Sequence, residues 1–231
     1  MWDCDGVLVD TERLVTRLEA QWITALGWPL TQADVVERFM GRSEATMTAE
    51  IERALGHELP AGWYADLRGA SHELFRAELT AVDGVVDVLD ALEVAGVATC
   101  VASSSGHDRL ALVLSITGLA ARFDGRVHSA EDVDRGKPHP DLFLHAARVQ
   151  GVAPTDCVVI EDSEPGVRGG VAAGMRVLGF GGGLAPTGSL RSAGAEIFEE
   201  MAELPALLGL VSSGPAERQA DQHAGQHRVR R

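Results

Sequence analysis

Two acidic residues near the amino terminus, Asp3 and Asp5, could do chemistry together. They stand in the segment DCDG, and residues two apart on an extended chain point to the same face. Adjacent carboxylates repel each other unless a cation or a shared proton compensates their charge. A surface turn with Asp before Gly would explain Asp5 alone, but not Asp3, which follows Trp2 in an apolar context. The pair therefore indicates a cation site or an acid–base pair.

Lys137 is the only lysine in the chain, and the other cationic side chains are arginines. A codon bias would explain the arginines, but it does not explain why one lysine remains. The compact ammonium of lysine cannot be replaced by the planar, forked guanidinium of arginine. The segment GKPHP places Lys137 at an expected helix start, where the helix dipole disfavours a cation. These two observations favour a functional lysine over a solvated one.

Polar residues also follow two apolar runs of the sequence. Ser103, Ser104 and Ser105 follow ATCVA, and hydroxyl and N–H groups before a helix can bind an anion. Helix capping is the alternative explanation, and we expect it for Ser105. Glu161 and Asp162 end the run CVVIED. One acid there would serve as a helix cap, but two adjacent acids exceed that need.

The expected elements explain how these groups could meet. Helical patterns cover 11–26, 31–40, 43–55 and 60–80, with Thr31 and Ser43 as N-caps. Further along, the apolar runs ATCVAS, RVHS, CVVIED and MRVLGF alternate with helical patterns over 83–95, 107–117, 138–150 and 163–173. Such alternation is typical of a parallel sheet that is covered by helices on both faces.

We therefore predict an α/β protein with a Rossmann-like, doubly wound parallel sheet core and an inserted all-helical cap domain. The core would comprise residues 1–11 and 82–211, and the cap residues 12–81. Residues 212–231 contain almost nothing apolar and are expected to form a disordered tail. In such sheets, ligands bind beyond the carboxyl ends of the strands, which is where all four polar groups lie.

The combined residue set predicts a magnesium site. Hard carboxylate oxygens suit Mg²⁺, which binds few protein ligands together with waters and a substrate phosphate. The cation would also remove the repulsion among the acids.

The motifs DCDGVLVDTE, VASSS, GKPHPDLF and VVIEDSEPGV resemble the four motifs of the haloacid dehalogenase-like superfamily, in the right order. The resemblance covers about residues 1–185, and it is strongest to the sugar-phosphate phosphatase and β-phosphoglucomutase-like group with a helical cap. It implies that Asp3 is the nucleophile, which forms a phosphoaspartate, and that Asp5 is the general acid and base. An ionised aspartate is an adequate nucleophile once Mg²⁺ and lysine offset its repulsion with phosphate, and we expect a neighbouring carboxylate to raise the pKa of Asp5 toward general acid catalysis. It also implies that Ser103 and Lys137 bind the phosphoryl group.

The same resemblance implies the metal ligands and a part of the substrate site. Asp3, Asp5 through its backbone carbonyl, Asp162 and the nearby Glu161 would form the Mg²⁺ site. The cap should set the substrate, a small phosphate ester that is expected to be a sugar phosphate. We expect Arg42, in the cap segment FMGRSE, and Ser104 to contact it, although a surface role for Arg42 is an equal alternative.

Three other functions were weighed against a phosphatase. A β-phosphoglucomutase-like enzyme carries a His a few residues beyond the first motif, where this chain has Val15, so hydrolysis is favoured. A phospho-Asp receiver module has its acid pair, phosphorylated Asp and Lys in a different order and has no helical insertion. A 2-haloacid dehalogenase lacks the second Asp of the first motif, so Asp5 argues against that activity.

Composition narrows the possible partners and the compartment. The 231 residues have a formal net charge of −14, which disfavours binding to nucleic acids and anionic membranes. We find no long apolar run and no signal-peptide pattern. The three cysteines, Cys4, Cys100 and Cys157, are expected to be buried thiols in a reducing cytoplasm. We expect a cytoplasmic monomer.

The first expected strand is unusually short, because only Met1 and Trp2 precede Asp3. The family resemblance implies four or five apolar residues there, and central strands typically run for five or six residues. We therefore expect the native chain to begin upstream, with apolar β-branched residues before Met1.

Overall fold

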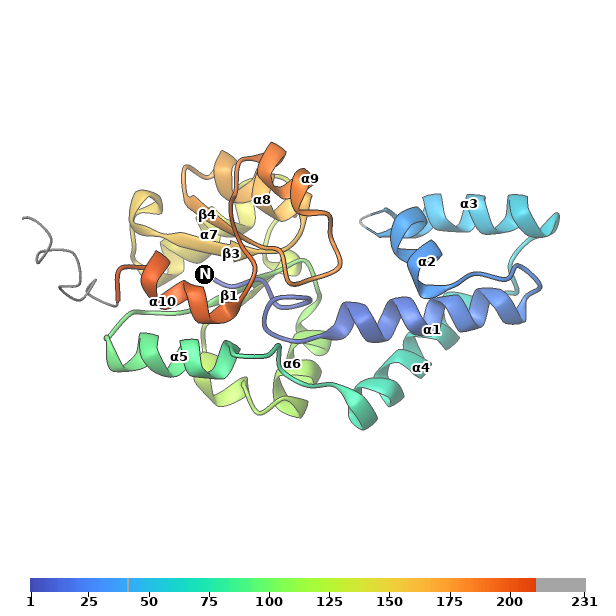
Figure 1. Cartoon of the computed structure of the whole chain (residues 1–231), viewed down its shortest axis with the longest axis horizontal. Coiled ribbons are helices and arrows are strands. Elements are labelled where there is room, and N and C mark those ends of the chain that lie inside the picture. The colour runs from blue at the N-terminus through green and yellow to red at the C-terminus, as the bar shows by residue number, and fades with distance from the viewer. Residues whose placement is uncertain (41, 211–231) are drawn as a thin grey trace, which may run out of the picture.

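The structure is a computed structural model, and it describes residues 1–40 and 42–210. The expected tail, residues 212–231, lies outside the described residues. Figure 1 shows two lobes: a core with a sheet between layers of helices, and a smaller lobe made of α1 to α4. None of the helices within the described ranges combines the length and apolar character that crossing a membrane requires.

The core sheet is entirely parallel, and the amino-terminal segment lies at its centre. Trp2 forms parallel bridges to Val101 of β1 on one side and to Ile160 of β3 on the other. The order across the sheet is therefore β2, β1, the amino-terminal segment, β3, β4 and β5. The strands are β1 (Val101–Ser103), β2 (Val127–Ser129), β3 (Val158–Glu161), β4 (Arg176–Phe180) and β5 (Glu196–Phe198).

Backbone hydrogen bonds on both sides hold the short central segment. Trp2 donates to the carbonyl of Cys100, and Asp3 donates to the carbonyl of Ile160, each at 2.9 Å. The N–H of Ala102 donates to Trp2 at 2.8 Å. Trp2 is itself buried with only 2% of its surface exposed. Two neighbouring strands therefore fix the position of Asp3 from both sides.

Helices cover both faces of the sheet, as the doubly wound prediction requires. One apolar cluster joins the sheet to α5, α6 and α10, and a second joins it to α7, α8 and α9. The alternating sequence pattern thus predicted the layering correctly. The core helices are α5 (Val85–Val94), α6 (His107–Ile116), α7 (Asp141–Gln150), α8 (Glu164–Ala172), α9 (Thr187–Ala193) and α10 (Leu204–Leu207).

The second lobe has its own apolar cluster, which includes the buried Trp63 and the half-buried Trp22 and Trp28. Thr31 and Ser43 accept hydrogen bonds from backbone N–H groups as N-caps, as predicted. Two chain segments connect this lobe to the core, and they are paired through the bridge between Val9 and Ala81. The lobe comprises α1 (Thr11–Ala25), α2 (Gln32–Phe39), α3 (Glu44–Leu55) and α4 (Trp63–Glu78).

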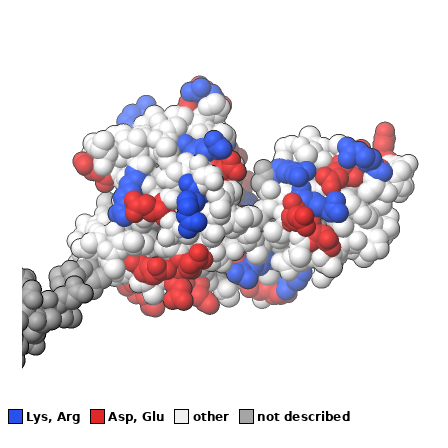
Figure 2. Space-filling view, turned by 45° about the horizontal axis from the view of Figure 1, so that its top comes forward, with Lys and Arg blue, Asp and Glu red and all other residues white. Residues whose placement is uncertain are grey.

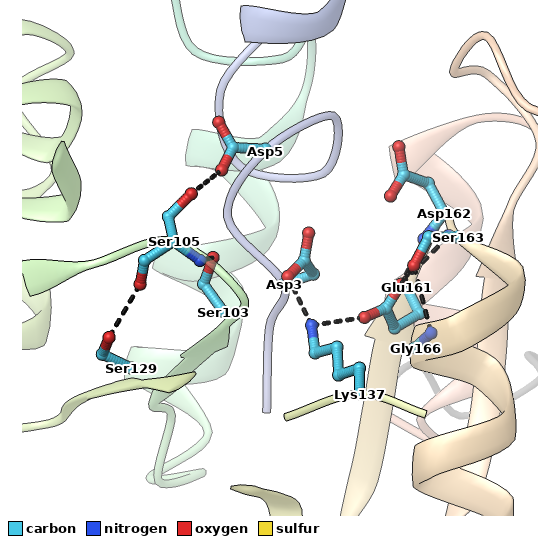
Figure 3. A network of polar contacts seen from close by, with 10 residues as sticks. All are labelled: Asp3, Asp5, Ser103, Ser105, Ser129, Lys137, Glu161, Asp162, Ser163 and Gly166. Carbon is cyan, nitrogen blue, oxygen red and sulfur yellow. Dashed lines mark hydrogen bonds and ion pairs between the residues drawn. The ribbon is translucent and has the colours of Figure 1, made fainter. Parts of the chain in front are cut away.

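One predicted helix boundary is wrong in a way that affects the site. The helix expected over 138–150 begins only at Asp141, as α7. A turn precedes it, in which His139 donates to the carbonyl of Gly136 at 3.0 Å. This turn lies at the sheet edge and directs Lys137 toward Asp3 (Figure 3).

Candidate active site

Lys137 joins two carboxylates at the centre of the sheet edge (Figure 3). Its ammonium lies 2.6 Å from Oδ1 of Asp3 and 2.5 Å from Oε1 of Glu161. The side chain of Lys137 is only 3% exposed, and that of Glu161 is fully buried. Burial alone would lower the pKa of Lys137, but the two carboxylates reverse this effect and raise it. The lysine is therefore a permanent cation that holds the two acids together.

Glu161 is fixed by the start of α8. Its second oxygen, Oε2, accepts from the backbone N–H groups of Asp162 and Ser163 at 3.1 and 3.0 Å, and from the Ser163 hydroxyl at 2.8 Å. A Cβ at Gly166 would lie 1.8 Å from Oε1 of Glu161, so only glycine leaves room for this side chain. Both oxygens of Glu161 therefore have donors.

Asp162 is buried, with 2% of its surface exposed, yet its Oδ2 has no hydrogen-bond partner in the described part of the chain. The Oε2 atom of Glu12 is buried and unpaired in the same way. One carboxylate oxygen from each of Asp3, Glu161 and Asp162 lies within 4.8 Å of the others. Unpaired buried carboxylates are costly. The arrangement fits a divalent cation that prefers oxygen ligands.

The protonation of these acids reflects the crowding of negative charge. The pKa of Asp3 is raised to about 7, mainly by burial and then by the negative charges of Glu161 and Asp5, although Lys137 opposes the shift. The pKa of Glu12 is raised to about 8, mainly by burial and then by the negative charges of Asp3 and Asp5. The pKa of Asp162 is raised for the same kind of reason. A bound cation would offset this repulsion and favour the charged forms.

Asp5 faces the opposite side of the sheet edge from Lys137 (Figure 3). Its Oδ1 accepts from Arg109 at 2.8 Å and from the Thr11 hydroxyl at 2.6 Å, and its Oδ2 accepts from the Ser105 hydroxyl at 2.7 Å. Burial would raise the pKa of Asp5, but the ion pair with Arg109 and these hydrogen bonds lower it instead. The expectation that a neighbouring carboxylate raises this pKa was wrong, because it did not include Arg109.

The serines after β1 have separate roles. The Ser103 hydroxyl is buried and accepts from the N–H of Ser105 at 3.1 Å. Ser105 does not cap α6, contrary to our expectation, because its hydroxyl is used by Asp5 and the N-cap position is Gly106. Ser104 is exposed, and its side chain has no hydrogen bond to the described residues.

A cavity of about 390 Å³ lies between the core and the second lobe. Asp5 and Arg109 line it from the core. Glu19 of α1, Arg42 just before α3 and several other side chains of the second lobe line it from the opposite side. Figure 2 shows the narrow waist between the two lobes on one face of the molecule. Arg42 is exposed and pairs with Glu50 at 3.4 Å. The structure thus places Arg42 apart from the Asp3 cluster, at the cavity that opens next to Asp5.

Sequence reasoning missed three polar residues of this site: Thr11, Glu12 and Arg109. The segment DTE showed the first two, but both have ordinary roles at a helix start, so nothing singled them out. Arg109 lies in the first turn of α6, and its reach to Asp5 depends on how that helix packs on the sheet. The available signal for Arg109 was Asp5 itself, an acid at a strand end to which the sequence assigned no cationic partner.

Comparison with known proteins agrees with this geometry. The model of the haloacid dehalogenase-like hydrolases matches residues 1–174. Hexitol phosphatase A of Escherichia coli is 32% identical over 77% of this chain and 80% of its own length. The "probable pseudouridine-5'-phosphatase" of Drosophila melanogaster is 35% identical over 77% of this chain and 79% of its own length.

A solved structure shows the same likeness over the whole fold. It is a conserved haloacid dehalogenase-like protein of unknown function from Agrobacterium tumefaciens, which is 35% identical to this chain. The superposition covers 90% of this chain and 96% of the other, with a TM-score of 0.82. The parallel core and the helical lobe are therefore shared with an experimentally solved protein.

Proposed function

Because the chain belongs to the haloacid dehalogenase-like hydrolase family and is a phosphatase, we propose that it hydrolyses a small polyhydroxylated phosphate monoester with Mg²⁺. The reaction would proceed through a phosphoaspartate at Asp3. The observation that carries this proposal is the buried contact of Lys137 with Asp3 and Glu161, next to the unpaired Oδ2 of Asp162.

The residues fit a magnesium ion. The carboxylates of Asp3 and Asp162 and the backbone carbonyl of Asp5 would hold it, with Glu161 at the edge of the cluster. Glu161 has donors on both oxygens, so we assign it mainly to positioning Lys137. Mg²⁺ bound there would supply positive charge that lets a carboxylate approach a phosphate group.

The chain's own residues then account for both halves of the reaction. An Asp3 oxygen bonds to phosphorus while the bond from phosphorus to the ester oxygen breaks, and Asp5 gives a proton to that leaving oxygen. Water next attacks the phosphorus and passes its proton to Asp5, and the bond between phosphorus and Asp3 breaks to release phosphate. Lys137 and Ser103 would bind the phosphoryl oxygens throughout.

The lowered pKa of Asp5 suits the second half, in which this side chain accepts a proton. The first half needs a protonated Asp5, and the ion pair with Arg109 opposes that state. Arg109 also lines the cavity between the lobes. We propose that the side chain of Arg109 rotates toward the bound substrate, which would release Asp5 to take up a proton.

Hydrolysis is favoured over the alternative, a mutase, by the half-buried Val15, which also lines the cavity. A valine cannot relay a proton to a sugar hydroxyl, whereas the resemblance to β-phosphoglucomutases implies a histidine at this point in a mutase. The other polar side chains of the cavity, among them Arg42 and Glu19, suit a substrate with several hydroxyl groups or a second anion. The related hexitol and pseudouridine-5' phosphatases are named for such substrates.

The experiment is a panel of hexitol, hexose, sugar-acid and nucleoside monophosphates, assayed by phosphate release with Mg²⁺ and with EDTA. We expect Mg²⁺-dependent release from one or more polyhydroxylated esters, and trapping of the acyl phosphate as a protein adduct after acid quench. Turnover that continues in EDTA would contradict the metal assignment. Isomerised sugar phosphate without phosphate release would favour the mutase.

A further inference from the structure

Two histidines and an aspartate meet at a second place on the core, separate from Asp3. His128 lies on β2, Asp132 ends the short helix η2 (Ala130–Asp132), and His145 lies on α7. One potential ligand atom from each of the three lies within 4.8 Å of the others. The two imidazole rings meet edge to face, with centroids 5.4 Å apart.

One nitrogen of each imidazole has a neighbour on α7. The Nε2 atom of His128 lies 3.3 Å from the amide nitrogen of Gln150, and Nδ1 of His145 lies 3.1 Å from Arg148. A glutamine amide can turn over and accept from Nε2–H, which would leave the lone pair on Nδ1 of His128. Metal-bound histidines typically have such an outer hydrogen bond, because it fixes the tautomer.

Asp132 is held in place from two directions. Its Oδ1 lies 2.8 Å from Nε2 of His107, and its Oδ2 accepts from the backbone N–H of Ser129 at 2.8 Å. His128 is only 4% exposed. A buried imidazole therefore lies beside a fixed carboxylate, and both groups are ordinary zinc ligands.

We propose that His128, Asp132 and His145 bind a transition-metal ion of the zinc class, with water or His107 as the fourth ligand. Imidazole nitrogens suit Zn²⁺, Co²⁺ and Ni²⁺, whereas Mg²⁺ prefers oxygen. Tetrahedral ligands at 2.0–2.1 Å from zinc are about 3.3 Å from one another. Small side-chain rotations would bring the three ligand atoms from their present spacing to that distance.

The site would connect the turn after β2 to α7, and this turn supports the active site. The Ser129 hydroxyl donates to the carbonyl of Ser105 at 2.8 Å, and the Ser105 hydroxyl donates to Asp5. Asp132 in turn accepts from the N–H of Ser129. A bound ion would therefore stiffen the turn, so we expect it to raise the melting temperature and to change the turnover number only modestly.

Arg148 competes for the site, because its guanidinium donates to Nδ1 of His145. It is exposed and can swing away when an ion binds. Arg148→Ala would remove this competing cation, so it should strengthen metal binding several-fold. If the two histidines only packed β2 against α7, this substitution would not strengthen metal binding.

The test uses the full chain, stripped with EDTA and returned to buffer with millimolar Mg²⁺, and then titrated with Co²⁺ or Zn²⁺. Binding is measured by calorimetry and by the visible absorption of imidazole-bound Co²⁺. We expect one ion in the wild type that Mg²⁺ does not displace. We expect His145→Gln and Asp132→Asn to weaken its binding by at least about tenfold.

His57→Gln, an exposed histidine in the helical lobe, is the matched control and should bind as the wild type does. Any Zn²⁺ or Co²⁺ at the Asp3 cluster would be unaffected by His145→Gln, so the difference between these proteins measures the histidine site alone. Asp132→Asn provides a second, exposed position if the His145 variant misfolds. Equal binding by the wild type and both variants, or no ion bound by the wild type, would overturn the proposal.

Discussion

The core and the helical lobe line the cavity between them in opposite ways. On the core side, Asp3, Lys137 and Glu161 are buried and joined by contacts of 2.5 and 2.6 Å. On the side of the helical lobe, the cap side, Arg42 is exposed, and its ion pair with Glu50 spans 3.4 Å. Buried charged networks tolerate little change, because removing one partner leaves another charge unpaired. Exposed pairs contribute little and can be exchanged.

This difference suggests a division of work within the molecule. The sheet edge, assembled from separate chain segments, would fix the reaction. The inserted helical lobe would choose the substrate, since Glu19 and Arg42 line the cavity without a hydrogen bond to Asp3 or Lys137. Substitutions on the core side should therefore change the turnover number, and those on the cap side should change the Michaelis constant.

Asp3→Asn gives the strongest test of the core side. We expect the turnover number to fall by at least about a hundredfold, because the amide cannot form the bond to phosphorus. The melting temperature should not fall. The amide replaces a buried carboxylate, whose charged form is disfavoured by burial, and Lys137 retains its ion pair with Glu161. Phosphate release and thermal unfolding measure the two effects, with the exposed Asp134→Asn as the control. More than a few per cent of residual activity would disprove this role for Asp3.

Lys137→Arg keeps the charge and should still cost at least about tenfold in turnover number. The guanidinium is larger than the ammonium and must enter a site where the lysine is only 3% exposed. The opposite exchange, Arg135→Lys, lies two residues away at an exposed pair with Asp141 and should leave activity unchanged. A wild-type rate in Lys137→Arg would mean that the single lysine has no special function.

Much of the core side could be predicted from sequence, because strand ends in a parallel sheet meet at one edge. Asp3, Lys137 and Asp162 could be placed there from the alternation of apolar runs and helices alone. The reach of Arg109 and Thr11 to Asp5 could not, since it depends on how α6 and α1 pack against the sheet. The last strand, β5, was also missed, because its two apolar residues stand between acidic residues in the segment EIFEE.

Arg42→Ala tests the cap side of the comparison. We expect the Michaelis constant to rise about fivefold, equivalent to about 1 kcal/mol for one hydrogen bond, with the turnover number nearly unchanged. Arg53→Ala, an exposed arginine on α3, the helix that follows Arg42, is the control and should change neither constant. Steady-state kinetics on the best ester of the panel would separate the two. A fall in turnover number alone would place Arg42 with the catalytic residues and break the proposed division.

The last effect concerns Glu19, a half-buried acid of the cap side, and burial raises its pKa to about 7. An ordinary glutamate titrates near 4.5, so the folded chain binds the extra proton between these two values. The contribution of Glu19 to stability is complete below pH 4.5 and is lost as the pH rises through 7.

Glu19→Gln removes this loss, so its melting temperature should match that of the wild type at pH 4.5. At pH 8 its melting temperature should exceed the wild-type value by several degrees, because a loss of up to about 3 kcal/mol is avoided and each kcal/mol corresponds to about 2–4 °C. Differential scanning calorimetry at both pH values measures this, with the exposed Glu37→Gln as the control. A pH-independent difference would show that Glu19 stays charged in the folded protein, and it would then offer the substrate an anion where we expect a neutral hydrogen-bonding group.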